Sequence, residues 1–314
     1  MADGKWIEGL TPGMSVGAAA HKVLSIRCAV VQHYLPLAVE KADEDIEYVH
    51  QLRVGTRRAG AALRVFRAVL PNRWRRRVRR ALRQLRQAAG AVRDWDVFLV
   101  HLGQAKPLHT AAGRPAADFL LGYGLGQRRA ALIHLAAVAA TDGPDFDEAA
   151  RQLLAALDEH GGRGPSFRQF ALDQFHTLLT GFHQAVLADP SQPAELHQLR
   201  IQGKRLRYAL EIFVPCLPEW FRDHLYPLIE QLQELLGTIQ DTVVEAERLR
   251  ELAVYLRQHR PQEWPRLRPG LDSRTKSLRA QIPPLRKAFQ KWRSQWLIQA
   301  EQAHQLLAAP LSVA

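Results

Sequence analysis

The sequence predicts an all-α protein made of two pseudo-symmetric four-helix bundles that arose by internal tandem duplication. Almost every periodic segment carries apolar residues at the 3.6-residue spacing of a helix, and convincing strand alternation is absent. The tetrapeptide His-Gln-Leu-Arg stands at residues 50–53 and again at 197–200, an offset of 147 positions. The same offset relates Gly90-x-x-Arg93-Asp94 to Gly237-x-x-Gln240-Asp241. An offset that persists over about forty positions indicates that one helical unit is present twice.

The first half is expected to fold into four major helices. Acidic residues open the second helix and Pro71 stops it, as helix termini favour. Thr141-Asp142-Gly143-Pro144 is expected to form a turn, because adjacent Gly and Pro residues interrupt helices. In chain order the predicted segments are 16–41 with a kink or break at Pro36, 43–69, 73–104, 115–140 and a short helix over 146–159.

The second half repeats this order. Its predicted segments are 166–187, 194–214, 218–258 and a final pair from Ser273 onward that Pro283-Pro284 separates. The glycine-rich run at 161–165 is the expected linker between the two repeats. The predicted boundary therefore divides the chain into a first repeat over residues 1–160 and a second over 161–314, which together form one domain.

The charge balance predicts a polyanionic partner. The 314 residues include 43 Lys and Arg against 31 Asp and Glu, a net charge of +12. Arginine outnumbers lysine, which suits forked hydrogen bonding to phosphate oxygens. The two cysteines, Cys28 and Cys216, lie in apolar helical contexts and are expected to be buried thiols. Residues 1–10 lack the order of a signal peptide and no run of 18 apolar residues occurs, so a cytoplasmic protein without a membrane contact is expected.

Each repeat carries a row of cations along one helical stripe, roughly 20 Å long at about 1.5 Å per residue. The first row has His50, Arg53, Arg57 and Arg64, with Arg58 alongside. The second has His197, Arg200, Lys204 and Arg207, with Arg205 alongside. Residues 50–93 contain fourteen arginines and no acidic residue, so like charges would repel along these helices. A bound anion would relieve this repulsion. For the arginines at 73–77 a simple solvated face is the alternative, and the sequence does not show which way the cluster at 73–80 faces.

A flexible linear polyanion with closely spaced charges fits two such rows best. Inorganic polyphosphate offers only phosphoryl oxygens, and its binding would release counterions. Nucleic acid fits the charge as well, but base stacking requires aromatic residues among the cations. Only Tyr208 lies within a row in a position to stack. The rows therefore favour polyphosphate over nucleic acid.

The two duplicated histidines and the two duplicated aspartates have different expected roles. His50 and His197 either tie their helices to a neighbour or contact an anion; no second ligand stands four residues away to support metal binding. Asp94 and Asp241 are expected to hold an arginine or histidine of their own repeat by ion pairing. One carboxylate per repeat is a poor basis for a magnesium site. No metal, cofactor or catalytic residue is predicted.

These paired motifs, with Glu211 closing the second one, resemble those of the CHAD family, whose name refers to conserved histidines in an α-helical domain. The resemblance covers residues from about 15 to 300. It implies two four-helix bundles that enclose a basic, polyphosphate-binding channel, sometimes at polyphosphate granules. It also implies a channel lined by the cations of both rows. Basic positions on other helices are plausible additions: Lys22, Arg83, Arg129 and Lys276.

Two departures from the family pattern accompany this resemblance. The first repeat has Gly60-Ala61 where the second has Arg207-Tyr208, so an asymmetric channel is expected. Many family members are fused to a triphosphate-tunnel domain, which is not recognisable here, so a polyphosphate-metabolising enzyme would be a separate partner. The sequence thus predicts non-catalytic polyphosphate binding. The alternatives are a helical nucleic-acid-binding protein, which base-dependent affinity would reveal, and a phosphate-processing enzyme, which metal-dependent turnover would reveal.

Overall fold

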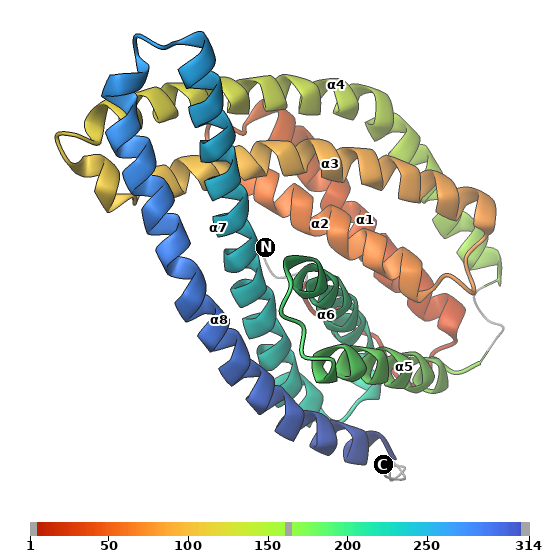
Figure 1. Cartoon of the computed structure of the whole chain (residues 1–314). Helices are drawn as coiled ribbons and strands as arrows, with labels where there is room; N and C mark the ends of the chain where they lie inside the picture. The colour runs from red at the N-terminus through yellow and green to blue at the C-terminus, as the bar shows by residue number, and fades with distance from the viewer. Residues whose placement is uncertain (1–4, 161–164, 309–314) are drawn as a thin grey trace.

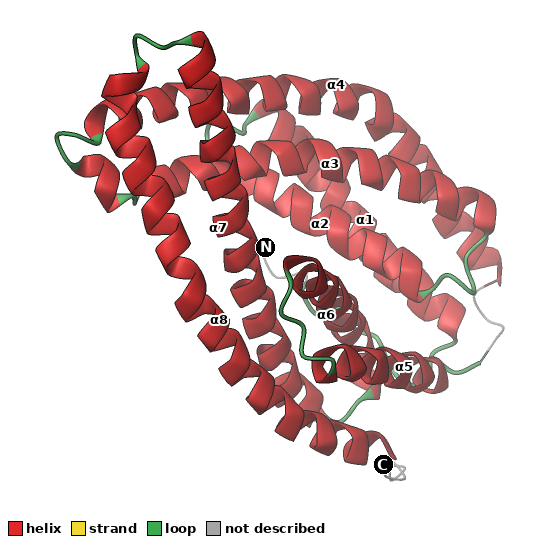
Figure 2. Ribbon diagram, viewed as in Figure 1, coloured by secondary structure: helices red, strands yellow, loops and turns green. Residues whose placement is uncertain are grey.

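The computed structural model describes residues 5–160 and 165–308, and within these ranges the chain consists of helices and connecting loops (Figure 2). Eight α-helices account for most of it: α1 (Val16–Glu40), α2 (Glu47–Val65), α3 (Asn72–Gly103), α4 (Arg114–His160), α5 (Phe167–Leu187), α6 (Pro193–Phe213), α7 (Tyr226–His259) and α8 (Trp264–Ala308). Short 3₁₀ turns at Lys106–His109 and Val214–Cys216 and a π-helical turn at Phe221–Leu225 join some of them. The predicted all-α class is confirmed.

Helices α1–α4 pack together, and so do α5–α8 (Figure 1). The two sets meet at two separate apolar cores. The larger core contains residues from all eight helices, and the rings of Phe66 on α2 and Phe170 on α5 stack within it at 5.9 Å. The smaller core joins the α3–α4 connection to the α7–α8 connection through residues such as Phe98, Leu120, Leu252 and Leu271. The two halves therefore contact each other through both cores.

The starts of the two halves are paired directly. Ser15 caps α1 and Ser166 caps α5, each accepting a hydrogen bond from a backbone N–H three residues later. An antiparallel bridge connects these serines, with Phe167 N donating to Met14 O at 2.7 Å. Helices α1 and α5 therefore begin side by side. The glycines predicted as a linker at 161–164 lie outside the described residues, so the predicted repeat boundary remains a prediction.

Two predicted interruptions, at 141–144 and at Pro283-Pro284, were wrong, because a helix continues through each. Helix α1 also continues through Pro36, which excludes the break, though not the kink, that was predicted there. Helix α4 passes the expected turn at 141–144, where Thr141 Oγ1 donates to the carbonyl oxygens of Ala137 and Val138. Just beyond, Phe146 is fully buried. Helix α8 passes Pro283-Pro284 in the same way, with Leu278 before them and Phe289 after them both buried.

Candidate functional site: a basic groove between the two halves

A groove of about 700 Å³ opens between α2, α3 and α6, and we call it the basic groove. Asp94 is the single carboxylate among the described residues that line it. Most of the rest of its wall is cationic. The cations are Arg53, Arg57 and Arg64 from α2, Arg79 and Arg86 from α3, and Lys204 and Arg205 from α6.

The amphipathic pattern of each helix turns these cations toward the groove. Helix α2 buries Leu52, Ala59 and Leu63, which lie on the face away from the arginines. Helix α6 likewise buries Leu199, Leu206 and Leu210. The arginines and Lys204 therefore remain on the faces that α2 and α6 present to each other. Five of the fourteen predicted binding residues thus line the groove: Arg53, Arg57 and Arg64 from one half, and Lys204 and Arg205 from the other.

An arginine, a glycine and an aspartate occupy matching positions in the two halves. Asp94 on α3 forms an ion pair with Arg53, with 3.3 Å between Oδ1 and Nη1, as predicted. A Cβ added to Gly90 would lie 4.0 Å from Arg53 Nε, and one added to Gly237 would lie 3.5 Å from Arg200 Nη2. Either Cβ would make only ordinary van der Waals contact with the guanidinium group, and α3 and α7 continue as helices through these glycines.

The second aspartate behaves differently from the first. Asp241 has no ion pair within the described residues. Its charge nevertheless raises the pKa of Arg200, in opposition to burial, which lowers it and dominates. Asp94 and Asp241 both line a second hollow of about 260 Å³, which we call the end pocket. The sequence did not indicate that these two carboxylates would line the same pocket.

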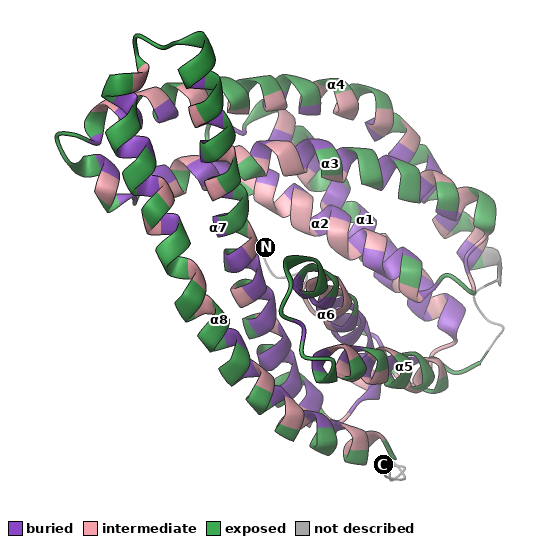
Figure 3. Cartoon of the chain, viewed as in Figure 1, coloured by how far each residue is buried: buried purple, intermediate pink, exposed green. Residues whose placement is uncertain are grey.

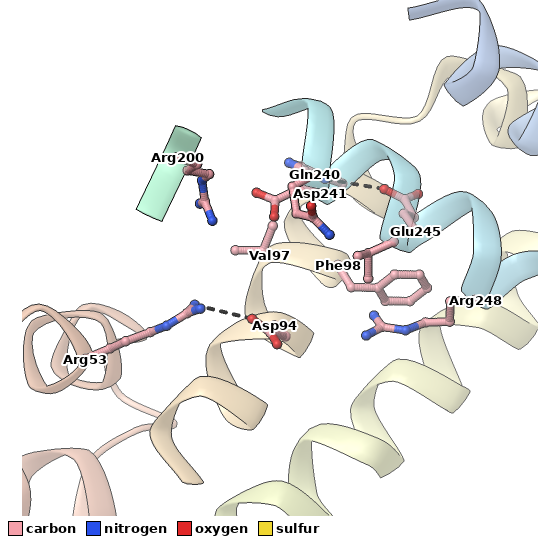
Figure 4. Close-up of a pocket in the computed structure, with 11 residues that line it drawn as sticks. Arg53, Asp94, Val97, Phe98, Arg200, Gln240, Asp241, Glu245 and Arg248 are labelled. Carbon is pink, nitrogen blue, oxygen red and sulfur yellow. Dashed lines mark hydrogen bonds and ion pairs between the residues drawn. The ribbon is translucent and has the colours of Figure 1, made fainter. Parts of the chain in front are cut away.

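The end pocket adjoins the basic groove, since Arg53 and Asp94 line both. Figure 4 shows Arg53 reaching Asp94 from α2, while Arg200 extends from α6 toward the same space. The far wall of the end pocket carries both acidic and basic side chains. Glu245 is buried and pairs with Arg274 at 2.6 Å, and Arg248 lies over the ring of Trp95 at 4.1 Å. The groove is therefore strongly cationic along its length and electrostatically mixed at this end.

The groove cations depress one another's pKa. Burial and the charges of Arg200, Arg57, Arg53 and Arg207 lower the pKa of Lys204 to about 7. Burial, followed by neighbouring arginines, also lowers the pKa of Arg57, Arg64 and Arg86. Within the described residues, no ion pair involves Arg57, Arg64, Arg79, Arg86, Lys204 or Arg205. The site thus concentrates positive charge that the protein itself leaves uncompensated.

Two cations of the predicted rows, Arg58 and Arg207, lie beside a buried acid and not in the groove. Arg58 donates from Nε to the buried carboxylate of Glu211 at 3.0 Å, and Arg27, which is 2% exposed, reaches the same carboxylate at 3.4 Å. Tyr226 donates its hydroxyl to Glu211 at 3.0 Å. Arg207 lies 4.0 Å from Glu211. Arg58 and Arg207 are not among the residues that line the groove; they surround an acid that joins the two halves.

The predicted histidine pair is not symmetric in its surroundings. His50 is half-buried just outside the groove, and burial together with Arg93, Arg53 and Arg57 lowers its pKa. The nearby Glu47 opposes that shift. His197 is exposed and is not a lining residue. Neither histidine is among the described residues that line the groove, although the charges of Arg53 and Arg57 act on His50.

The four additional basic positions do not line the groove. Arg129 is exposed on α4 and lies 3.9 Å from Asp43. Lys22 lines a hollow on α1 beside His21 and Asp158, and Lys276 lines one between α7 and α8. Arg83 is exposed on α3, where its charge still reaches Arg86. The structure therefore does not bring Arg129, Lys22, Lys276 and Arg83 together with the cations of the basic groove.

The arginine cluster at 73–80 divides between several environments. Arg79 lines the groove. Arg77 and Arg80 both pair with Asp145 on α4, at 2.5 and 3.0 Å. Arg75 is buried and donates to Asn72 at 2.8 Å. Neither of the two alternatives, a wholly solvated face or a wholly ligand-facing one, describes this cluster.

Arg79 and Arg86 are groove residues that the sequence interpretation did not single out. A usable signal existed, because both lie on the α3 stripe that continues through the duplicated Gly90 and Asp94. Elsewhere in the described chain, no group of three or more His, Cys, Asp or Glu side chains is placed to hold a metal ion. None of the described helices is both long and apolar enough to cross a bilayer.

Comparison with protein families matches residues 24–250 to the model described as CHAD domain. Among solved structures, the chain resembles the crystal structure of the CHAD domain from the plant Ricinus communis, with 25% identity, a TM-score of 0.72 and coverage of 92% of this chain and 95% of that one. It also resembles PptA from Streptomyces chartreusis, with 20% identity, a TM-score of 0.66 and coverage of 89% and 99%, a likeness of fold alone. No curated protein matches the chain.

Proposed function

The chain belongs to the CHAD domain family, and from this premise and the geometry of the basic groove we propose that it binds inorganic polyphosphate along the groove without altering it chemically. The observation that carries the proposal is the uncompensated charge of the groove. Among the described residues, seven cations line it, while the one lining carboxylate, Asp94, is already paired with Arg53. A ligand that carries several negative charges in a row supplies the counter-charges that the cations of this wall lack.

A linear chain of phosphates suits the arrangement of these cations. Arg53 and Arg64 are eleven residues apart on α2, so the arginine row extends over roughly 16 Å at about 1.5 Å per residue. Arg64 and Arg205 also line a further hollow of about 320 Å³ beyond the groove, which extends the basic path in that direction. A single phosphate or a compact anion would leave most of these cations unmatched. An extended polymer matches them together.

The groove offers little for the bases of a nucleic acid. Tyr208, the aromatic residue of the second row, is only 5% exposed, and the Arg207 guanidinium lies over its ring at 4.9 Å. Tyr208 does line the groove, but stacking of a base would require more of its ring to be exposed. Polyphosphate needs only the charged nitrogen atoms. This difference is the reason to favour polyphosphate over RNA or DNA.

We further propose that the protein holds the polymer rather than cleaving or extending it. The pairing of Asp94 with Arg53 supports this, since an ion-paired carboxylate is a weak general base. Any enzyme that processes the bound polymer would then be a separate protein. Where polyphosphate is stored in granules, the polyphosphate-binding chain described here would be found on them. Incubation with long-chain polyphosphate and divalent metal ions should therefore release no phosphate above that of a groove-neutralised variant.

The binding proposal is tested by neutralising groove cations. The variant Arg57→Gln/Arg64→Gln/Lys204→Gln removes three charges that have no partner in the protein. With about 1 kcal/mol for each lost phosphate contact, the Kd for polyphosphate should rise roughly a hundredfold. The matched control Arg129→Gln/Arg151→Gln/Arg268→Gln removes the same charge from exposed helical positions. Equal weakening in both variants would show that only net charge matters and would refute the groove as the site.

A further inference from the structure

The outward face of α8 carries a second set of cations, distinct from the basic groove. Residues 273–300 contain seven Lys and Arg and no acidic residue. Two of the seven are already used inside the fold: Arg274 pairs with Glu245 at 2.6 Å and Arg293 with Asp189 at 3.3 Å. The remaining five form what we call the outer face of α8: Lys276, Arg279, Arg286, Lys287 and Lys291.

These five side chains share one side of the helix. Leu278, Phe289 and Trp292 are buried on the opposite side, and the outer face is exposed along its length (Figure 3). From Lys276 to Lys291 it spans roughly 22 Å at about 1.5 Å per residue. No ion pair involves any of the five within the described residues. A row of like charges at helical spacing weakens the helix unless an anion lies along it.

Several other exposed cations of this chain are paired with acids. Arg114 pairs with Asp118, Arg151 with Glu148 and Arg268 with Asp272, each within a single turn of helix. Mixed signs of this kind are what a purely solvated surface favours. On α8, Arg268 is paired in this way, whereas the five cations of the outer face have no ion pair within the described residues. The outer face therefore lacks the neighbouring acids that accompany these paired cations.

A built hollow lies at the start of this face. A pocket of about 310 Å³ between α7 and α8 is lined by Arg257, Lys276 and Arg279, with Asp272 at its edge. The residues of α7 that line it, from Leu249 to Arg257, lie on the side of that helix opposite to the end pocket, which takes Gln240, Asp241 and Val244. Helix α7 thus separates the two basic regions, and α8 lies on its far side from α2 and α6 (Figure 1).

We propose that the outer face of α8 binds a second polyphosphate chain, so that one molecule of this protein bridges two chains. This inference rests on the proposed function of the groove. The outer face presents charge without aromatic rings, because Phe289, Trp292 and Trp296 are buried on the other side. It therefore offers phosphate contacts and no platform for bases. Two binding surfaces on opposite sides of α7 would let the protein crosslink polymer rather than only coat it.

A sandwich capture experiment tests this bridging. Long-chain polyphosphate is immobilised, the protein is bound and washed, and a second, fluorescently labelled polyphosphate is added. The variant Lys276→Gln/Arg279→Gln/Arg286→Gln/Lys287→Gln should bind the immobilised chain as the wild type does but capture at least tenfold less of the second chain. A control with four paired cations neutralised, Arg114→Gln/Arg129→Gln/Arg151→Gln/Arg268→Gln, should capture it normally.

The outcomes separate this inference from the proposed function. Wild-type protein that does not bind the immobilised chain would refute polyphosphate binding altogether. Wild-type protein that binds it but captures no second chain, or an outer-face variant that captures as well as the wild type, would refute bridging alone. Capture of charge-matched single-stranded RNA in preference to polyphosphate would reassign the outer face to nucleic acid and so overturn the proposal.

Discussion

Lys204 gives the groove a pH-dependent signature that can be calculated. In the free protein, burial and the surrounding arginines lower the pKa of this lysine to about 7 from 10.5. At pH 8 only about one in ten molecules then carries the proton on Lys204. A polyphosphate chain in the groove offsets the neighbouring cations and returns the pKa toward its ordinary value. Binding at pH 8 should therefore take up about 0.9 proton per protein.

The sign of the pH effect follows from the lowered pKa. Between pH 7 and 10.5 the unfolded chain holds more protons at Lys204 than the free folded protein does, so the free protein gains stability as the pH rises through this window. Below pH 7 Lys204 is charged in both the folded and the unfolded state, so its destabilisation of the folded state reaches its full value. The affinity for polyphosphate runs the opposite way. Its Kd should rise toward tenfold per pH unit between pH 8 and 9, because each binding event must recruit a proton.

Calorimetry in buffers of different ionisation enthalpy measures this uptake. A plot of apparent binding enthalpy against buffer enthalpy at pH 8 has a slope equal to the protons exchanged. Lys204→Met should lower the slope to near zero, and Lys204→Arg should do so while keeping the positive charge and most of the affinity. A wild-type slope near zero, or equal slopes in the wild type and Lys204→Met, would refute the reasoning.

Three further predictions concern stability and salt. Arg57→Met should raise the midpoint of urea unfolding of the free protein, since it removes a cation from a cluster of like charges. The same substitution should weaken polyphosphate binding. A lowered unfolding midpoint would contradict this prediction. Glu211→Gln should cost about 3–5 kcal/mol of unfolding free energy, because Arg27 and Arg58 lose their buried counter-charge, and a loss below about 1 kcal/mol in the same titration would be inconsistent with it. The slope of log Kd against log salt should become shallower by about one for each groove cation removed, whereas unchanged slopes would argue against phosphate contacts.

The helices themselves were largely predictable, because their apolar spacing is a local property. The predicted segment 166–187 became α5, and 194–214 became α6, within a residue or two at each end. Some helices continue through prolines at which they were predicted to end, and the reason is physical. A proline removes one hydrogen bond, and buried residues on both sides of it, such as Leu278 and Phe289 in α8, offset that loss. Such offsets come from packing between distant segments, which local patterns do not contain.

The groove was predictable to the extent that it follows helical stripes. Arg53, Arg57 and Lys204 were identified because duplicated residues at helical spacing share a face. Arg58 was misplaced because it lies next to Arg57 in sequence but points to the other side, where Glu211 lies 153 residues away. Arg79 and Arg86 were missed because they were seen as part of an arginine cluster rather than as an extension of the stripe through Asp94. Pairings across the two halves are set by the tertiary fold alone.

The most direct test of the central claim is a competition titration at near-physiological salt. Wild-type protein is saturated with labelled single-stranded RNA, and unlabelled long-chain polyphosphate of matched total charge is added, followed by the reverse order. Polyphosphate is predicted to displace the RNA completely, while RNA should fail to displace polyphosphate. Equal exchange in both directions, or an affinity that depends on base sequence, would contradict polyphosphate as the ligand of the basic groove.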